Sequence, residues 1–259
     1  MEILITNDDG IYAPGLEALR TAARRLGNVT VVAPLDEQSG VSHSITLTSP
    51  LRAIPVRRSG DLLGYAVTGA PSDCVKIALR SGLAPRPDVI LSGINFCPNL
   101  GVHVLYSGTI AAAREGAMMG VPSIAISMDF AEEPDFEGAA EVACRVIRPV
   151  LERIADGREV PAMLNVNIPA LAPSQLRGVR VVPQCALVYS EGVERRTDPS
   201  GREYYWLTFG GELEGDAQGT DVGAFREGYV TVTPLHHDLT DLEWLARISE
   251  KDFGTVGEG

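Results

Sequence analysis

Short apolar runs alternate with longer amphipathic stretches along the first two thirds of the chain. Apolar runs of about 4 to 8 residues are typical of strands buried on both faces, and apolar residues spaced three or four apart are typical of helices. Strands are predicted at Glu2–Thr6, Val29–Ala33, Asp88–Ser92, Ser123–Ser127 and Met163–Ile168. Helices are predicted between them at Pro14–Leu26, Ser72–Leu83, Ser107–Met119 and Glu137–Ala155. This order predicts an α/β fold, with a Rossmann-like, mostly parallel sheet and helices on both faces.

The last third of the chain has a different pattern. Strand-like runs at Val179–Pro183, Tyr204–Leu207 and Tyr229–Pro234 are separated by polar, glycine-rich stretches. This spacing predicts antiparallel hairpins instead of further strand–helix–strand units. A short helix is expected at Leu242–Ile248, followed by a frayed tail at residues 249–259.

The length and the hydrophobic content together predict one large domain. The chain has 259 residues, 45% of them hydrophobic, which is enough to bury a sizeable core. No repeat and no low-complexity linker divides the sequence. We therefore expect a single domain over residues 1–259, with a Rossmann-like core over about residues 1–170 and a β-rich C-terminal extension over about residues 171–259.

The charge and the cysteines exclude several classes of function. The net charge of −12 repels polyanions, which argues against binding to a nucleic acid polymer. No apolar run of about 18 residues predicts a membrane span, and no basic and apolar leader precedes the first predicted strand. The four cysteines are scattered without a Cys-x-x-Cys pair, which argues against zinc clusters. We therefore expect a cytoplasmic protein with no membrane attachment.

Polar clusters follow the predicted strands at the points where each strand ends. The clusters are Asn7–Gly10, Asp36–Ser44, Ser92–Asn95 and Tyr106–Thr109, the last of which opens a predicted helix. In open α/β sheets, ligands bind outside the carboxyl ends of the strands. We therefore expect the four clusters to lie along one edge of the sheet.

The adjacent carboxylates of Asp8 and Asp9 indicate a site for a divalent cation. Two neighbouring aspartates repel each other, and a bound cation removes that repulsion. Magnesium takes carboxylate, amide and hydroxyl oxygens, and Ser39 and Asn95 offer such oxygens from two further loops. The alternative interpretation is that the acidic pair caps the next helix or forms an Asx turn. Against capping, Pro14 suits a first helical position and lies several residues later.

The segment Ser107–Gly108–Thr109 has the character of an anion site. It stands at a predicted helix start, where backbone N–H groups and the helix dipole favour a phosphate. Asn99 precedes it in a loop that contains glycine and proline. The alternative for Ser107 is that it only caps the helix, and His43 remains either a functional group or an ordinary loop residue.

Taken together, these motifs strongly resemble the SurE family of survival-protein nucleotidases over about residues 1–241. The resemblance implies a metal-dependent phosphatase that acts on nucleoside 5'- and 3'-monophosphates, with short polyphosphate as a further substrate of some members. It also implies homodimers or homotetramers that exchange C-terminal segments. The segments that carry it are, in chain order, "ILITNDDGIYAPG", "VVAPLDEQSGVSHSITLTSPLR", "VTGAPSDCVKIAL", "PDVILSGIN", "NLGVHVLYSGTIAAAREG", "LNVNIP" and "GTDVGAFREGYVTVTPL".

The resemblance also assigns roles to single residues. It implies one divalent ion per subunit, Mg²⁺ or Mn²⁺. The implied metal ligands are Asp8, Asp9, Ser39 and Asn95. The implied catalytic residues are Asp8, Asp9, Asn99 and Ser107. The implied phosphate-binding residues are Asn95, Asn99, Ser107, Gly108 and Thr109. The chain departs from the family pattern at Cys97, Val102 and His103, so the loop between Asn95 and Tyr106 is expected to have its own shape.

The expected reaction is direct hydrolysis, in which a metal-activated water attacks the phosphate. His43 and His103 are candidates for the acid that protonates the leaving oxygen. One alternative is a phosphatase in which Asp8 becomes an aspartyl-phosphate. Another is a non-enzyme, a Mg²⁺-binding switch that resembles a phospho-receiver domain, although this chain is about twice the usual length of one.

Overall fold

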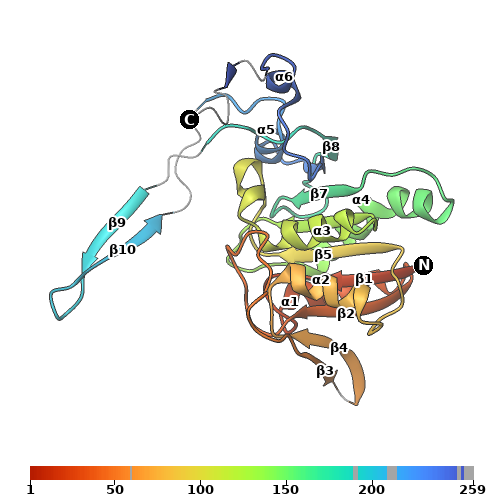
Figure 1. The fold of residues 1–259 in the computed structure, drawn as a ribbon. Coiled ribbons are helices and arrows are strands. Elements are labelled where there is room, and N and C mark those ends of the chain that lie inside the picture. The colour runs from red at the N-terminus through yellow and green to blue at the C-terminus, as the bar shows by residue number, and fades with distance from the viewer. Residues whose placement is uncertain (59, 189–191, 209–214, 250–251, 254–259) are drawn as a thin grey trace, which may run out of the picture.

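The fold is built around one large sheet (Figure 1). The computed structural model describes all residues except 59, 189–191, 209–214, 250–251 and 254–259. Among the described residues, nine strands form this sheet in the order β3-β4-β2-β1-β5-β6-β7-β11-β8. The bounds of its first strands are Glu2–Thr6 (β1), Asn28–Pro34 (β2), Ala53–Arg58 (β3), Asp61–Val67 (β4), Val89–Asn95 (β5), Ser123–Met128 (β6) and Met163–Ile168 (β7).

The centre of the sheet is parallel, as expected. β1 pairs in parallel with β2 on one side and with β5 on the other, and β5, β6 and β7 continue the parallel order. The chain therefore runs from β1 to one side of the sheet and later returns to the other side. The junction of β1 and β5 is the point where the strand order reverses, and such a point is where open α/β sheets bind ligands.

Helices cover both faces of the sheet. Helices α1 (Pro14–Ala23) and α4 (Phe136–Ala155) share one hydrophobic core with β1, β5, β6 and β7. Helices α2 (Pro71–Arg80) and α3 (Gly108–Met118) contact each other, and a second apolar cluster joins both of them to the sheet. These bounds agree with the predicted helices to within a few residues at each end. The Rossmann-like α/β prediction is confirmed.

The sequence patterns missed the antiparallel pair formed by β3 and β4. β3 is mostly exposed and has no continuous apolar run, whereas β4 contains the largely apolar run Leu62–Val67, which was a usable signal. β4 pairs in parallel with β2, and β3 pairs antiparallel with β4 at the edge of the sheet.

The C-terminal strands divide between two sheets. β8 (Val179–Val181) and β11 (Val230–Leu235) belong to the large sheet, where β11 is antiparallel to β7 and parallel to β8. β9 (Gly192–Thr197) and β10 (Glu203–Thr208) form a separate two-stranded antiparallel sheet that extends away from the body (Figure 1). The antiparallel character expected for this part of the chain is confirmed for β10, whose partner β9 was not predicted, and for the pairing of β11 with β7. The expectation is wrong for β8, which pairs in parallel with β11.

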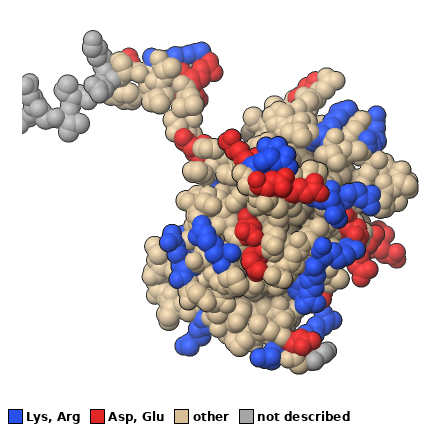
Figure 2. All heavy atoms as spheres, turned by 90° about the vertical axis from the view of Figure 1, so that its right-hand side faces the viewer, with Lys and Arg blue, Asp and Glu red and all other residues tan. Residues whose placement is uncertain are grey.

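Short helices complete the described part of the chain. They are η1 (Gly101–Leu105), α5 (Asp221–Arg226) and α6 (Leu242–Leu245). Most of the tail expected at residues 249–259 lies outside the described residues. Among the residues that are described, no helix is long and apolar enough to cross a membrane. Figure 2 shows acidic and basic side chains interspersed on one face, so the net charge of −12 does not form a single acidic field there.

Candidate functional site

The four predicted polar clusters meet where β1 and β5 end, and the fourth, Tyr106–Thr109, contacts the first through Thr109 and Asp8. Asn7–Gly10 directly follows β1, and Asn95 is the last residue of β5, the neighbouring strand. The third cluster joins them through the backbone, because the N–H of Gln38 donates to the carbonyl of Asp8 at 2.8 Å. The turn after β1 is fixed by Asn7, whose Nδ2 donates to the carbonyl of Gly10 at 3.0 Å.

Asp8 is held by the start of α3. Its carboxylate is 4% exposed and accepts a hydrogen bond from the hydroxyl of Thr109. Burial raises the pKa of Asp8 above its usual 3.8, although hydrogen bonds from the Thr109 side chain and backbone offset part of this effect. Helix α1 begins at Pro14 with Ala13 as its N-cap residue and no side-chain cap. The capping interpretation of the acidic pair is therefore wrong.

Asp9 is the more exposed carboxylate of the pair. Burial, followed by repulsion from Asp8 and Glu37, raises the pKa of Asp9 to about 7. Among the described residues, neither Asp8 nor Asp9 forms an ion pair with a lysine or arginine. A buried and a half-buried carboxylate without a cationic partner are costly, and a divalent ion would supply the missing positive charge.

The donor set around this pair fits a hard divalent cation. Asn95 donates its Nδ2 to the carbonyl of Cys97 at 2.7 Å, which leaves its side-chain oxygen for a ligand. The exposed Ser39 hydroxyl donates to Glu37 at 2.7 Å and keeps its lone pairs. The buried Oδ1 of Asn7 has no hydrogen-bond partner in the described part of the chain. Within the same residues, no group of three or more His, Cys, Asp or Glu side chains forms a metal site. Carboxylate, amide and hydroxyl oxygens therefore make up the predicted set, as magnesium prefers.

The N-terminus of α3 packs directly on Asp8. Ser107 is the N-cap, and its hydroxyl accepts a hydrogen bond from the N–H of Ile110 at 3.2 Å. A Cβ atom at Gly108 would lie 2.7 Å from the Cβ of Asp8, so only glycine permits this approach. Ser107 thus caps the helix and still has its hydroxyl proton for a substrate oxygen. The Thr109 hydroxyl is bound to Asp8, and the part of Thr109 in phosphate binding stays a prediction.

Asn99 lies in a buried network that anchors its whole backbone. Its N–H donates to Oδ1 of Asn167 at 2.7 Å, and its carbonyl accepts from Nδ2 of Asn165 at 2.7 Å. Its own Nδ2 donates to the hydroxyl of Ser127 at 2.8 Å. The network fixes Asn99 over the ends of β6 and β7. The side-chain oxygen and the second amide hydrogen of Asn99 remain for a ligand.

A buried carboxylate from the C-terminal part holds the same loop. Asp221, at the start of α5, is 0% exposed and accepts from the N–H of Gly101 at 2.9 Å and from the N–H of Cys185 at 2.8 Å. Gly101 has a φ of 53°, in the left-handed region that favours glycine. The loop after Asn99 is thus fixed by a residue about 120 positions later in the chain.

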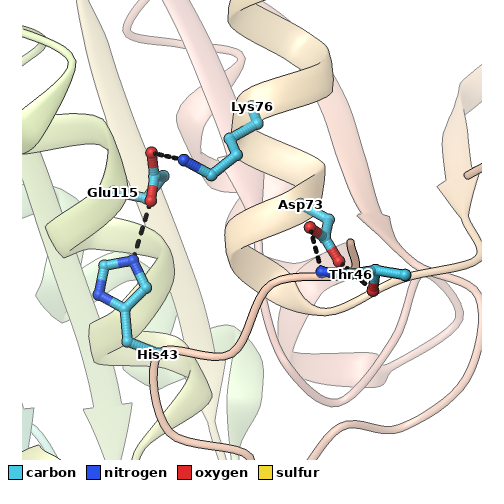
Figure 3. A network of polar contacts seen from close by, with 5 residues as sticks. All are labelled: His43, Thr46, Asp73, Lys76 and Glu115. Carbon is cyan, nitrogen blue, oxygen red and sulfur yellow. Dashed lines mark hydrogen bonds and ion pairs between the residues drawn. The ribbon is translucent and has the colours of Figure 1, made fainter. Parts of the chain in front are cut away.

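The loop that carries Ser39 is fastened by two buried carboxylates (Figure 3). His43 Nε2 lies 2.9 Å from Glu115, and Lys76 donates to the other oxygen of Glu115 at 2.6 Å. Further along the loop, Thr46 donates to Asp73 through its N–H at 3.1 Å and its hydroxyl at 2.7 Å. These contacts attach the loop to α2 and α3.

The position of His43 argues against its role as the leaving-group acid. Glu115 lies two turns into α3, about 12 Å along the helix from Ser107. The histidine that binds Glu115 is therefore directed away from the helix N-terminus. The loop departures lie closer to the site: the exposed Cys97 follows Asn95 by two residues, and Val102 and His103 belong to η1.

Several supporting residues were missed by sequence reasoning. Asn165 and Asn167 alternate in the buried strand "MLNVNI", so they share one face, and buried amides at such positions need partners. That pattern was a usable signal. Asp221 and Glu115 gave none, because an acid at a helix start or on a helix surface is ordinary in sequence.

Comparisons with known proteins agree with this architecture. The family model described as survival protein SurE matches residues 3–191. A protein of Syntrophobacter fumaroxidans named 5'-nucleotidase SurE is 46% identical over 245 residues, covering 95% of this chain and 97% of that protein. A protein of the same name from Rhodopirellula baltica is 45% identical, with 96% and 98% covered.

A solved structure extends the likeness to three dimensions. The crystal structure of the SurE protein from Aquifex aeolicus has a TM-score of 0.83 to this chain at 41% identity, and it covers 98% of this chain and 100% of that one. The family model spans well over half of the sequence, and the relatives match nearly its full length. The chain therefore belongs to the SurE family of survival proteins.

Proposed function

We propose that this protein is a 5'-nucleotidase that hydrolyses nucleoside 5'-monophosphates to nucleoside and phosphate. The observation that carries the proposal is the contact of Asp8, one of two adjacent carboxylates without a cationic partner among the described residues, with the N-terminus of α3. A helix N-terminus favours phosphate, and an unpaired acidic pair favours a cation. A phosphate monoester with a divalent counter-ion satisfies both. The names of the relatives support this substrate class.

One Mg²⁺ or Mn²⁺ per subunit is part of the proposal. Its ligands would be Asp8, Asp9, Ser39 and Asn95. When bound, such an ion neutralises charge on the phosphoryl group and lowers the pKa of a water molecule. The residues of the chain then divide the remaining work. Ser107 and the N–H groups at the start of α3 hold phosphate oxygens, and Asn99 offers its amide from the opposite loop.

The two aspartates have different tasks in this reaction. Asp8 is held in one orientation by Thr109 and by the close packing of Gly108. Asp9 has no such hydrogen bond among the described contacts and is less buried. Asp9 is therefore the carboxylate that orients the attacking water and accepts its proton.

We also propose that the β9–β10 hairpin joins subunits into a homodimer or homotetramer. Every residue of both strands is exposed, including Val193, Trp206 and Leu207 at 62%, 58% and 69%. Exposed apolar side chains on a projecting hairpin support exchange with a second copy of the chain.

The decisive experiment is phosphate release from a panel of substrates. The panel contains adenosine, guanosine, cytidine and uridine 5'-monophosphates, adenosine 3'-monophosphate and tripolyphosphate, each with Mg²⁺, Mn²⁺ or EDTA. We expect turnover of the 5'-monophosphates that requires metal and falls at least about 10²-fold in Asp8→Asn. Asp61→Asn, an exposed carboxylate at the start of β4, is the matched control.

Three outcomes contradict the proposal in different ways. Failure to turn over any 5'-monophosphate with either metal removes the nucleotidase assignment. A covalent phosphoenzyme, detected by intact-protein mass after acid quenching, replaces direct hydrolysis with nucleophilic attack by Asp8. A single phosphorylation event without turnover indicates a phospho-receiver switch.

A further inference from the structure

Three phenylalanine rings form a cluster beside the candidate site. Phe96 lies 5.0 Å from Phe130 and 5.5 Å from Phe136, measured between ring centroids. Phe96 and Phe136 pack against the main hydrophobic core, whereas Phe130 is 68% exposed. Exposure of a single apolar ring is ordinary, so what distinguishes Phe130 is the support that Phe96 gives it and its place beside the candidate site. Phe130 therefore presents a supported aromatic surface to solvent.

The backbone around Phe130 is fixed. The N–H of Asp129 donates to the carbonyl of Ile168 at 2.9 Å, and the N–H of Phe130 donates to Oδ1 of Asp129 at 2.9 Å. The ring stands on Phe96 with an interplanar angle of 33°. A ring held on both its backbone and its rear face is ordered before any ligand arrives, which lowers the entropy cost of binding.

The cluster lies next to the predicted metal and phosphate groups. Phe96 directly follows Asn95, whose strand partner is Ser127 on β6, and Phe130 follows the end of β6. β1, β5 and β6 are consecutive neighbours in the sheet, so the ends of β1 and β6 are about 10 Å apart.

The two sides of this edge differ in chemistry. On the side of α2 and α3, the site offers helix N–H groups and hydroxyls, which suit a phosphate. On the side of α1 and α4, it offers neutral aromatic rings, which have nothing to donate to a phosphate but stack well on a planar heterocycle. A substrate with a phosphate at one end and a flat ring at the other spans both sides, with the sugar between them.

We propose that Phe96 and Phe130 form the stacking platform for the nucleobase and so determine that this enzyme prefers nucleotides to sugar phosphates. The inference rests on the proposed function, because it concerns the base of the same substrate. Phe130 is the contacting ring, and Phe96 supports it. Purines, which have the larger π-face, stack more strongly than pyrimidines, so the platform favours purine nucleotides.

Kinetics on paired substrates test the platform. We would compare adenosine 5'-monophosphate, cytidine 5'-monophosphate and ribose 5-phosphate in the native protein and in Phe130→Ala. We expect KM for the adenosine substrate to rise about tenfold, or about 1.4 kcal/mol, the size of one base–aromatic stack. The change is smaller for the cytidine substrate and absent for ribose 5-phosphate. Met118→Ala, which removes a similarly exposed apolar side chain at the far end of α3, is the control.

Direct binding separates the platform from the proposed reaction. In Phe130→Trp, stacking of adenosine 5'-monophosphate quenches the emission of the new indole, and ribose 5-phosphate does not. The native chain has two tryptophans, and its response to the same ligands is subtracted. Base-dependent quenching without turnover supports the platform while the nucleotidase assignment fails.

Two results overturn the platform. The first is an equal loss of activity on ribose 5-phosphate and on the nucleotides in Phe130→Ala, without base-dependent quenching in Phe130→Trp. The second is a change in molar mass by light scattering in Phe130→Ala with unchanged KM values, which assigns the exposed ring to a contact between subunits.

Discussion

Two regions of the molecule differ in which side chains they bury. One is the rim, the loops at the carboxyl ends of the strands, and the other is the β9–β10 hairpin. At the rim, polar groups such as Asp8, Asn99 and Asp221 are buried and bound by the chain itself. On the hairpin, apolar groups such as Trp206 and Leu207 are exposed. The proposed ligand of the rim is therefore a small molecule, whereas the proposed partner of the hairpin is a second copy of the chain. Chemistry and assembly are assigned to different parts of one chain.

The largest expected effect comes from adding one methyl group at the rim. In Gly108→Ala, the new Cβ would lie 2.7 Å from the Cβ and 2.9 Å from Oδ2 of Asp8, so the carboxylate must move. A displacement of about 1 Å at a reacting group costs on the order of 10² in rate. We expect kcat on a 5'-monophosphate to fall by about that factor, measured as phosphate release with saturating metal.

The stability of Gly108→Ala separates displacement of Asp8 from unfolding. Alanine is the better helix former by about 1 kcal/mol, so helix propensity alone would stabilise α3. An active variant with native kcat would show that the contact between Gly108 and Asp8 does not position the carboxylate. Catalysis at the rim would then not depend on the close packing of α3 against Asp8.

This contact illustrates where sequence reasoning succeeds and where it stops. Continuous apolar runs placed β1, β5 and β7 correctly, and the rule for strand ends brought Asp8 and Asn95 to one edge. The same reasoning placed Thr109 at the phosphate site but gave no sign that its hydroxyl binds Asp8, because spacing along the chain does not show which group lies closest across two elements. The metal-binding and phosphate-binding roles of these residues remain predictions.

Supporting contacts were the least predictable part of the molecule. Asp221 holds Gly101 across about 120 positions of sequence, and no local pattern encodes such a pair. The edge strand β3 was missed because most of its residues are exposed, whereas the apolar run of β4 was a signal that went unused. The spacing of apolar residues shows which face of a helix or strand is buried. It carries little information on which distant segment supplies a hydrogen-bond partner.

The second expected effect concerns the hairpin. The double variant Trp206→Ser, Leu207→Ser removes two exposed apolar side chains from β10. If the hairpin joins subunits, loss of one such anchor weakens association by about 2 kcal/mol or more, roughly 30-fold in dissociation constant. Light scattering over a dilution series measures the change, with Leu62→Ser on β4 as the control.

The outcome also tests the separation of chemistry from assembly. We expect the dissociated variant to retain native circular dichroism, because the rim and the main sheet are built without the hairpin. A monomeric native protein at all concentrations would contradict the proposed role of the hairpin. Loss of assembly together with complete loss of kcat would show that the rim is incomplete in one subunit.

A smaller effect is expected where the C-terminal part supports the rim. Asp221→Asn keeps the shape of the side chain but removes the charge that accepts hydrogen bonds from Gly101 and Cys185. Hydrogen bonds to a charged group contribute about 1.5 to 3 kcal/mol, so we expect a loss of about 2 kcal/mol in the free energy of unfolding. Urea denaturation measures it, and Asp156→Asn, an exposed acid after α4, should change it by less than about 0.5 kcal/mol.

The smallest effect concerns the contacts of His43 and Lys76 with Glu115, called the clasp below, and it depends on pH. Desolvation raises the pKa of Glu115, but hydrogen bonds from His43 and Lys76 outweigh it and hold the pKa below its usual 4.5. A carboxyl whose pKa is lower in the folded state stabilises the fold above the unfolded pKa, and the contribution is lost as pH falls through the folded pKa. Since Lys76 is 42% exposed, solvent screening limits the contribution to about 1 kcal/mol.

In Glu115→Gln we therefore expect unfolding by urea to be easier by about 1 kcal/mol near pH 7, with the difference shrinking below about pH 4.5. Glu152→Gln, an exposed glutamate on α4, should show no such pH-dependent difference. Because the clasp holds the loop that carries Ser39, KM for a 5'-monophosphate should also rise in Glu115→Gln while kcat changes little. A difference from the native protein that stays constant down to pH 3.5 would mean that the ionised form of Glu115 does not fasten the loop, and Thr46 with Asp73 would then be its main anchor.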